Sequence, residues 1–319
     1  MTKVFSLPLK FWKDLNFRNA FKTADSRFIL FTGFKFASIS FATLAIVGYQ
    51  LYVNARLNFY FFQAHGYSSI AELKEAYFDH LLINFSEILP FIFFFIIAVF
   101  LVGLYVAAII LRPFKNIGDY SVKVLDDPNT PYKVDEFAGH RLVTRFSELF
   151  FDYLQTSRTN GKLEERAIPP QYMGIHGPIF DGAFLFHFSF FIAIMTIVSI
   201  VAIMNIAFDI HENTIQLAIE VLKADPKVLS SFFSAQTHML DELWIITALL
   251  VCVLNLLLAL HLYKAVSGAA FGIFATMRSF IKGNHSARVH LVGYSYLRDS
   301  TRQLNKYLDW VQKNLAKKP

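Results

Sequence analysis

The sequence predicts an all-α membrane protein with four transmembrane helices. These helices form a tandem repeat of two-helix units, each followed by a pair of cytoplasmic helices. Of the 319 residues 55% are hydrophobic, only 17% are charged and 36 are Phe, a composition that departs from that of soluble proteins toward lipid contact. In addition, four apolar stretches are long enough to cross a bilayer, and one sequence offset relates the two halves of the chain.

The four apolar stretches each hold about 20 or more mostly apolar residues, which at 1.5 Å rise per residue crosses a hydrocarbon core of about 30 Å. The predicted spans are residues 28–53, 88–111, 184–208 and 243–262. A basic leader, residues 1–27, precedes the first span, which therefore resembles a retained start-transfer helix more than a cleaved signal peptide. Apolar and basic residues alternate in this leader, so we expect an amphipathic helix on the inner membrane surface.

The distribution of Lys and Arg predicts the orientation of the spans. The leader carries six of these residues, segment 112–183 carries nine and segment 264–319 carries ten. The short connections 54–87 and 209–242 carry two each, and both are predicted to be helical hairpins. By the positive-inside rule we expect a multi-pass protein of the bacterial inner (cytoplasmic) membrane, with both termini in the cytoplasm.

An ungapped offset of 157 residues relates the two halves of the chain. It aligns identical residues in both cytoplasmic segments and places the first span on the third. We therefore predict two parallel repeats, residues 28–158 and 184–315, joined by a linker, residues 159–183. Among the identities are Arg141 with Arg298, Thr144 with Thr301 and Asp152 with Asp309.

Each repeat ends in a cytoplasmic segment, residues 112–158 or 263–315, with the apolar spacing of amphipathic helices. A short helix follows the span directly, then a connector, then a longer helix. The apolar faces of these helices should form the core of a helical bundle. The predicted core residues are Phe114, Phe150, Tyr153, Leu154, Phe271, Tyr307, Trp310 and Val311.

Four short motifs accompany these helices. The first copy has Pro113 at the membrane exit, Asp135-Glu136-Phe137 before its second helix, and Phe146-Ser147-Glu148-Leu149 within it. The second copy has Leu304-Asn305-Lys306-Tyr307 but lacks the Pro and the Asp-Glu pair. This arrangement resembles the HAMP linker domain of bacterial receptors and histidine kinases. The resemblance implies a parallel helical bundle that conveys movement from transmembrane helices.

HAMP domains ordinarily form their four-helix bundle by dimerisation, whereas this chain holds two HAMP-like copies. Three arrangements stay open: closure of the two copies within one chain, closure between chains in a homo-oligomer, and packing of each copy against a different partner.

Several polar residues lie inside the predicted spans, where such residues are functional candidates. Snorkelling of a Lys and Asn bridges between helices are the ordinary alternatives. His187 and His261 lie at similar depth, yet no haem attachment motif accompanies them, so no cofactor is predicted. A lone Cys252 rules out a multi-Cys metal site, and no metal site is predicted. The candidates are Lys35, His187, Asn205, Asn255 and His261.

Four further histidines, His65, His80, His211 and His238, fall in the two outside connections. Imidazole titrates near neutral pH, so a pH or metal sensor is conceivable. Their positions do not coincide in the repeat, and ordinary surface or packing roles are favoured.

No catalytic motif is present, so we expect no enzymatic activity. The membrane accounts for the net charge of +6, and no nucleic-acid partner is expected. Two functions remain: a signal relay or adaptor acting on a separate cytoplasmic or membrane protein, and a structural accessory subunit that scaffolds a larger membrane complex such as a transporter, a motor or envelope machinery. Membrane lipids are expected partners of either, and a homo-oligomer is possible.

Overall fold

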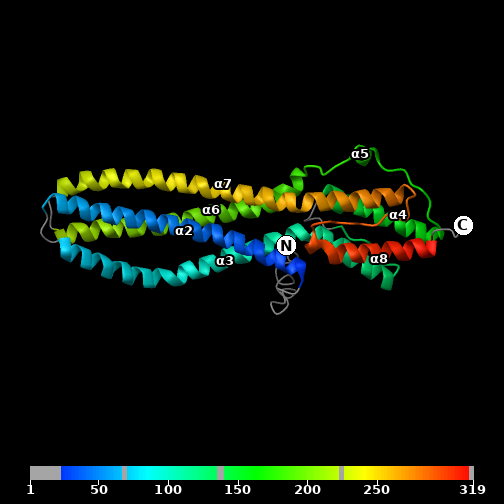
Figure 1. Ribbon diagram of the computed structural model, residues 1–319, viewed down its shortest axis with the longest axis horizontal. Coiled ribbons are helices and arrows are strands. Elements are labelled where there is room, and N and C mark those ends of the chain that lie inside the picture. Colours follow the sequence, from blue (N-terminus) through cyan, green and yellow to red (C-terminus); the bar gives the residue numbers. More distant parts are fainter. Residues whose placement is uncertain (1–22, 67–69, 135–139, 223–225, 316–319) are drawn as a thin grey trace. The chain divides into compact units, whose positions relative to one another are not determined.

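A computed structural model describes residues 23–66, 70–134, 140–222 and 226–315. Within these ranges every regular element is helical and no strand occurs (Figure 1). Most of the predicted leader and the Asp135-Glu136-Phe137 motif lie outside the described residues. The elements are α2 (Ala24–Ala64), α3 (Ile70–Asp126), the π-helix η2 (Arg141–Arg145), α4 (Phe146–Asn160), α5 (Pro170–Met173), α6 (Gly182–Leu222), α7 (Pro226–Ile281), the 3-10 helix η3 (Ser295–Leu297) and α8 (Arg298–Leu315).

Four of these helices, α2, α3, α6 and α7, are long and apolar enough to cross a membrane. Their most apolar windows have mean hydropathy between 1.7 and 3.0. With 41 residues, α2 is about 60 Å long, twice the hydrocarbon core. These four helices are compatible with a multi-pass membrane protein, and they extend well beyond the predicted spans.

The two predicted outside hairpins are helical on both sides of their turns, and their helices are continuous with those of the predicted spans. Helix α2 runs to Ala64 and α3 begins at Ile70, while α6 runs to Leu222 and α7 begins at Pro226. Helix α3 also continues through Pro113 to Asp126. Loss of one backbone donor is tolerated inside a long helix that neighbouring elements hold in place.

The chain divides into two compact units. The long-helix unit comprises Gly33–Gly103 and Ile192–Leu258, and contains only α2, α3, α6 and α7. The loop-rich unit comprises Met1–Thr32, Leu104–Phe191 and Ala259–Pro319. All four long helices contribute residues to both units, and α3 and α7 contribute longer stretches to the loop-rich unit than α2 and α6 do.

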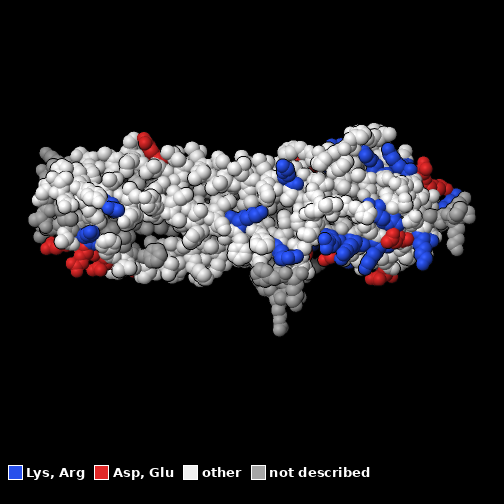
Figure 2. All heavy atoms as spheres, in the orientation of Figure 1, with Lys and Arg blue, Asp and Glu red and all other residues white. Residues whose placement is uncertain are grey.

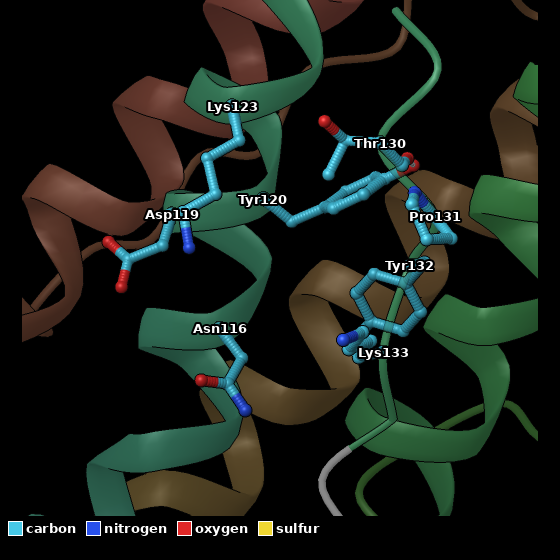
Figure 3. Close-up of a pocket in the computed structure, with 8 residues that line it drawn as sticks. All are labelled: Asn116, Asp119, Tyr120, Lys123, Thr130, Pro131, Tyr132 and Lys133. Atoms are coloured by element: carbon cyan, nitrogen blue, oxygen red, sulfur yellow. Dashed lines mark hydrogen bonds between the residues drawn. The ribbon is translucent and has the colours of Figure 1, made fainter. Parts of the chain in front are cut away.

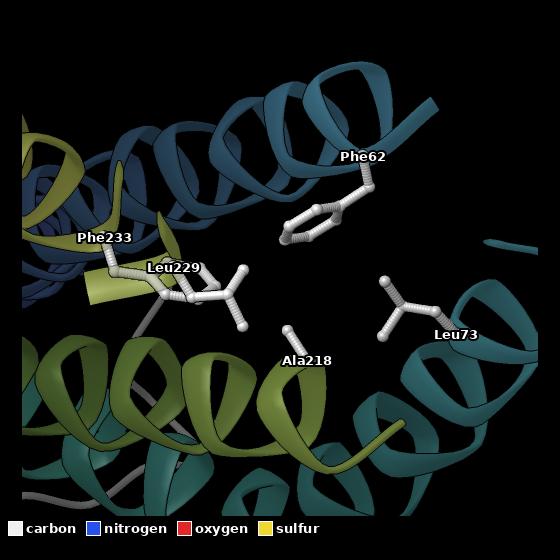
Figure 4. Close-up of a cluster of buried hydrophobic side chains, with 5 residues drawn as sticks. All are labelled: Phe62, Leu73, Ala218, Leu229 and Phe233. Carbon is white, nitrogen blue, oxygen red and sulfur yellow. The ribbon is translucent and has the colours of Figure 1, made fainter. Parts of the chain in front are cut away.

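In the long-helix unit, two apolar clusters form a core between helices that run side by side (Figure 1). The inner cluster consists of Val47, Ile203, Ala207, Leu240 and Trp244. The end cluster consists of Phe62, Leu73, Ala218, Leu229 and Phe233, whose side chains converge in Figure 4. Many large apolar side chains, such as Phe91 at 71% exposure, point outward, as expected of a lipid-facing surface.

Close approach of α2 and α3 in this unit depends on glycine. A methyl group at position 103 would lie 2.8 Å from the Cα of Gly33 and 2.8 Å from the ring of Phe36. No residue larger than glycine fits there without moving the helices apart. Contacts of this kind between small residues are common between membrane helices.

The loop-rich unit has an aromatic core shared by α4, α8 and the last parts of α3 and α7. Phe146 of α4 meets Phe274 of α7 with ring centroids 4.6 Å apart, and Phe150 meets Phe280 at 6.0 Å. Phe151 contacts Tyr120 of α3 at 4.5 Å. The helices of both predicted cytoplasmic segments therefore pack into one unit.

A segment that we call the strap, residues 161–181, runs from the end of α4 to the start of α6. It begins at Gly161, which caps α4 with φ 69°. The Leu163 amide then donates to the carbonyl of Leu315, and the Arg166 amide donates to that of Ile281. Further along, the Arg278 guanidinium of α7 donates to the carbonyls of Tyr172 and Ile175. The strap thus contacts α7 and α8 through its own backbone amides and carbonyls.

Candidate functional site: a polar layer in the long-helix unit

Three polar residues of α2, Gln50, Asn54 and Asn58, are spaced four residues apart. This spacing puts them on one face of the helix, and that face points into the unit. Asn54 and Asn58 are each only 3% exposed, and Gln50 is half-buried. Polar partners on α6 and α7 meet them there.

A hydrogen-bonded chain crosses from α2 to α7 through a histidine of α6. The Asn54 side-chain amide lies 3.2 Å from Nδ1 of His211, and Nε2 of the same ring lies 3.1 Å from the Thr237 hydroxyl. Because an amide nitrogen only donates, Nδ1 accepts and the ring proton sits on Nε2, donated to Thr237. His211 is 3% exposed and neutral in this arrangement.

Two further contacts join α2 to α7. The Gln236 amide donates to the Asn58 carbonyl oxygen at 2.5 Å, and the Gln50 amide donates to the Thr247 hydroxyl at 3.1 Å. We call these seven residues the polar layer: Gln50, Asn54, Asn58, His211, Gln236, Thr237 and Thr247. Bonds of this kind hold membrane helices together at about 1 kcal/mol each.

The polar layer leaves several buried atoms without a partner among the described residues. They are Oε1 of Gln50, Oδ1 of Asn54, Nδ2 of Asn58 and Oε1 of Gln236, with Nε1 of Trp244 beside them. Each such atom costs about 1–3 kcal/mol in an apolar surrounding. A layer that holds this many unpaired groups beside two apolar clusters is a candidate for function.

Sequence reasoning missed this layer, although two signals mark it. The i, i+4, i+8 spacing of Gln50, Asn54 and Asn58 is one. The other is the offset of 157, which takes Asn54 to His211, the residue that it contacts. Surface or packing roles are favoured for the histidines of the predicted outside connections. For His211 this expectation misses the hydrogen bonds to Asn54 and Thr237.

The predicted intramembrane candidates do not gather into a site. Lys35, His187, Asn205 and His261 are exposed on their helices, and only Asn255 is buried, at 7% exposure. The His187 ring bonds to the carbonyl of Ala183 in its own helix.

Most of the predicted bundle-core residues lie together in the loop-rich unit. Phe114, Phe150, Tyr153, Leu154, Tyr307 and Val311 are at most 3% exposed, whereas Phe271 and Trp310 are half-buried. Trp310 instead lies under the guanidinium of Arg158, 4.6 Å from its ring centroid. The ring of α4 that approaches Tyr307 is Phe151, at 6.3 Å. Burial raises the pKa of Tyr307, which is consistent with its place in the core.

A second buried histidine lies in the loop-rich unit, at the start of η2. His140 is fully buried, and its Nδ1 accepts from the Leu142 amide and lies 3.6 Å from Asp181. Asp181 in turn accepts from the amides of Arg141 and Phe184. Burial lowers the pKa of His140 to about 4, against the opposing effect of the Asp181 charge. This cluster joins η2 to the first turn of α6.

A groove of about 490 Å³ lies in the loop-rich unit between α3 and the connector after it. Tyr120 and Tyr132 pack edge to face on its floor at 4.9 Å, and the side chains around them are shown in Figure 3. Its rim carries Lys123 and Lys133 but also Asp119, so the lining selects no single class of ligand.

Among the described residues no group of three or more His, Cys, Asp or Glu is placed to hold a metal ion. No protein family, curated protein or solved structure matches the chain.

Proposed function

We propose that the chain is a non-enzymatic signal relay or adaptor of the bacterial inner membrane. In this proposal the long-helix unit receives the stimulus, and the loop-rich unit, on the cytoplasmic side, passes it to a separate partner protein. The observation that carries it is the continuity of α3 and α7, which have residues in both units. A change of packing around α3 or α7 in one unit then alters the packing around the same helix in the other unit.

A tandem repeat is supported by the helix bounds. Helices α2 and α6 both have 41 residues, and a shift of 157 brings their bounds into register within one residue. The same shift brings the bounds of α3 onto those of α7 within two residues. Asn54 and His211, which contact each other, are also 157 apart. Contact between equivalent positions is expected close to a pseudo-two-fold axis between the copies.

The proposed HAMP-like bundle is supported by the shared aromatic core. Helix α4 comes from the first copy, whereas α7 and α8 come from the second, and their rings meet at Phe146–Phe274 and Phe151–Tyr307. We therefore propose that the two copies form one bundle within a single chain, in place of the dimer that HAMP domains ordinarily require.

The proposed orientation is supported by the charges. In Figure 2 Lys and Arg side chains gather over the loop-rich unit, while the visible surface of the long-helix unit is mostly uncharged. By the positive-inside rule the loop-rich unit belongs in the cytoplasm.

Coupling between the units is tested by locking one and observing the other. In a chain without Cys252, cysteines at Gln50 and Thr247, which hydrogen-bond across α2 and α7, are oxidised in nanodiscs. Hydrogen exchange of α4 and α8 is then compared before and after reduction. A relay predicts altered exchange there. The single variants Gln50→Cys and Thr247→Cys, which cannot form the bond, should leave it unchanged. Unaltered exchange with the lock contradicts the relay.

The accessory-subunit alternative is favoured by one observation. Only five residues separate α2 from α3 and only three separate α6 from α7, too few for a folded sensor domain. Purification in mild detergent distinguishes the two functions. Co-purification of a kinase or chemotaxis component supports the relay, and co-purification of a transporter, motor or envelope complex supports the scaffold.

A further inference from the structure

The bonding of His211 fixes one protonation state. Its Nδ1 accepts from the Asn54 amide and its Nε2–H donates to Thr237, so the imidazole is neutral and joins α2 to α7 through α6. Both ring nitrogens are in use. A proton added to Nδ1 would face the amide hydrogens of Asn54 and break this link.

Asn54 carries the means to rebuild it. Its Oδ1 is buried and has no partner among the described residues. If the amide turns over about its last side-chain bond, Oδ1 takes the place of the amide nitrogen and accepts from the protonated Nδ1. The turned amide replaces one hydrogen bond to Nδ1 by another, so the link between Asn54 and His211 is kept in both protonation states.

Charged groups on the helices around His211 are mostly acidic. The half-buried Asp241 of α7, one turn after Thr237, acts electrostatically on the ring. His238 and Glu242 of α7 form an exposed pair at 3.5 Å, and Arg56 of α2 is exposed and donates to the Tyr60 hydroxyl. Further exposed acidic groups are Asp209, Glu212 and Glu220 on α6, and Glu72, Glu75, Asp79 and Glu87 on α3, where Lys74 is an exposed base. Burial of the ring opposes a positive charge on it, and this surplus of negative charge offsets part of that cost.

We propose that the polar layer is a proton-responsive switch, in which His211 takes up a proton at Nδ1 and the Asn54 amide turns over to receive it. The proton comes from water at the end of the unit that carries these acidic residues. Its charge alters the packing among α2, α6 and α7. That this change is a stimulus rests on the relay function proposed above, whereas the switch itself does not.

The switch is tested on the protein alone in nanodiscs, with ¹⁵N-labelled histidine observed by NMR between pH 8 and pH 4.5. The loss of one signal in His211→Gln identifies the residue. We expect the neutral ring with its proton on Nε2 at high pH, and conversion to imidazolium within this range. In Asn54→Asp, a carboxylate beside Nδ1 should raise the midpoint by about one pH unit or more. The control His238→Gln, at an exposed position, should leave the midpoint unchanged.

Titration of His211 with the expected shift in Asn54→Asp supports the switch. The switch is overturned if His211 stays neutral down to pH 4.5 in folded protein. It is also overturned if the titration midpoint of His211 is the same in Asn54→Asp as in the unaltered protein. Since no partner protein is present, these outcomes are independent of the locking and co-purification experiments, which decide the relay function.

Discussion

The two units bury different chemistry in their interiors. In the loop-rich unit, rings from α3, α4 and α7 meet edge to face, and a ring packed on all sides has few alternative positions. In the long-helix unit, the polar layer lies beside two apolar clusters and leaves buried atoms unpaired among the described residues. Polar groups of this kind can exchange partners without exposing apolar surface. We therefore expect the loop-rich unit to be rigid and the long-helix unit to be able to change its packing.

The largest expected effect is the loss of a ring from the rigid core. Phe150 is fully buried against Phe151 and Phe280, so Phe150→Ala should destabilise the loop-rich unit by about 3–5 kcal/mol. In a Trp12→Phe, Trp244→Phe background, fluorescence of Trp310 reports unfolding of this unit alone. The control Phe180→Ala, at a side chain 70% exposed, should cost about 0.5 kcal/mol or less. Equal losses for both variants would show that the ring cluster is not the core.

The second effect is a pH dependence of the loop-rich unit. His140 takes up a proton near pH 6.5 when unfolded but only near pH 4 when folded, because burial lowers its pKa. Between these values the unfolded state binds more protons, so stability is lost as the pH falls, by about 3 kcal/mol in all. Unfolding followed by Trp310 at pH 7 and at pH 4.5 measures this loss. His140→Gln should flatten the dependence, and His176→Gln, at an exposed histidine, should keep it. An unchanged slope in His140→Gln contradicts the assignment.

The third effect sharpens the comparison inside the long-helix unit. Gly103→Ala places a methyl group 2.8 Å from the backbone of Gly33 and should cost about 1–3 kcal/mol as α2 and α3 separate. At Gly48, also helical, a methyl group meets nothing within 4 Å, so Gly48→Ala should be neutral or stabilising. Thermal unfolding in detergent compares the two, and similar behaviour of both variants would argue against a close contact at Gly103.

The smallest effect concerns the strap. Arg278→Ala removes the charged donor to the carbonyls of Tyr172 and Ile175 and should cost about 1–2 kcal/mol. Hydrogen exchange and proteolysis of residues 166–175 should become faster. Arg302→Ala, at an exposed position on α8, is the matched control. A strap that is equally protected in both variants must be held by other contacts.

Hydropathy and length predicted the four apolar helices, because a run of apolar residues identifies a membrane helix without tertiary information. The same signal did not predict where they end. The first predicted span stops at residue 53, whereas in the structure α2 continues to Ala64 and Asn54 and Asn58 lie on its buried face. Periodicity placed Phe150 and Tyr307 on buried faces, but it could not tell that Phe151 is the ring that meets Tyr307. Contacts between distant segments, such as that of Arg278 with the strap, have no local signal.

We proposed that the two HAMP-like copies close on each other within one chain. Crosslinking between α4 and α8 tests this proposal most directly. Cysteines replace Phe151 and Tyr307, whose ring centroids are 6.3 Å apart, in a chain without Cys252, and the protein is oxidised in dilute detergent. A pair at exposed Arg302 and Asp152 is the control. On a non-reducing gel we predict a faster-migrating monomer that returns to normal mobility with reductant. A dimer-sized band, or no crosslink at all, would contradict closure within the chain.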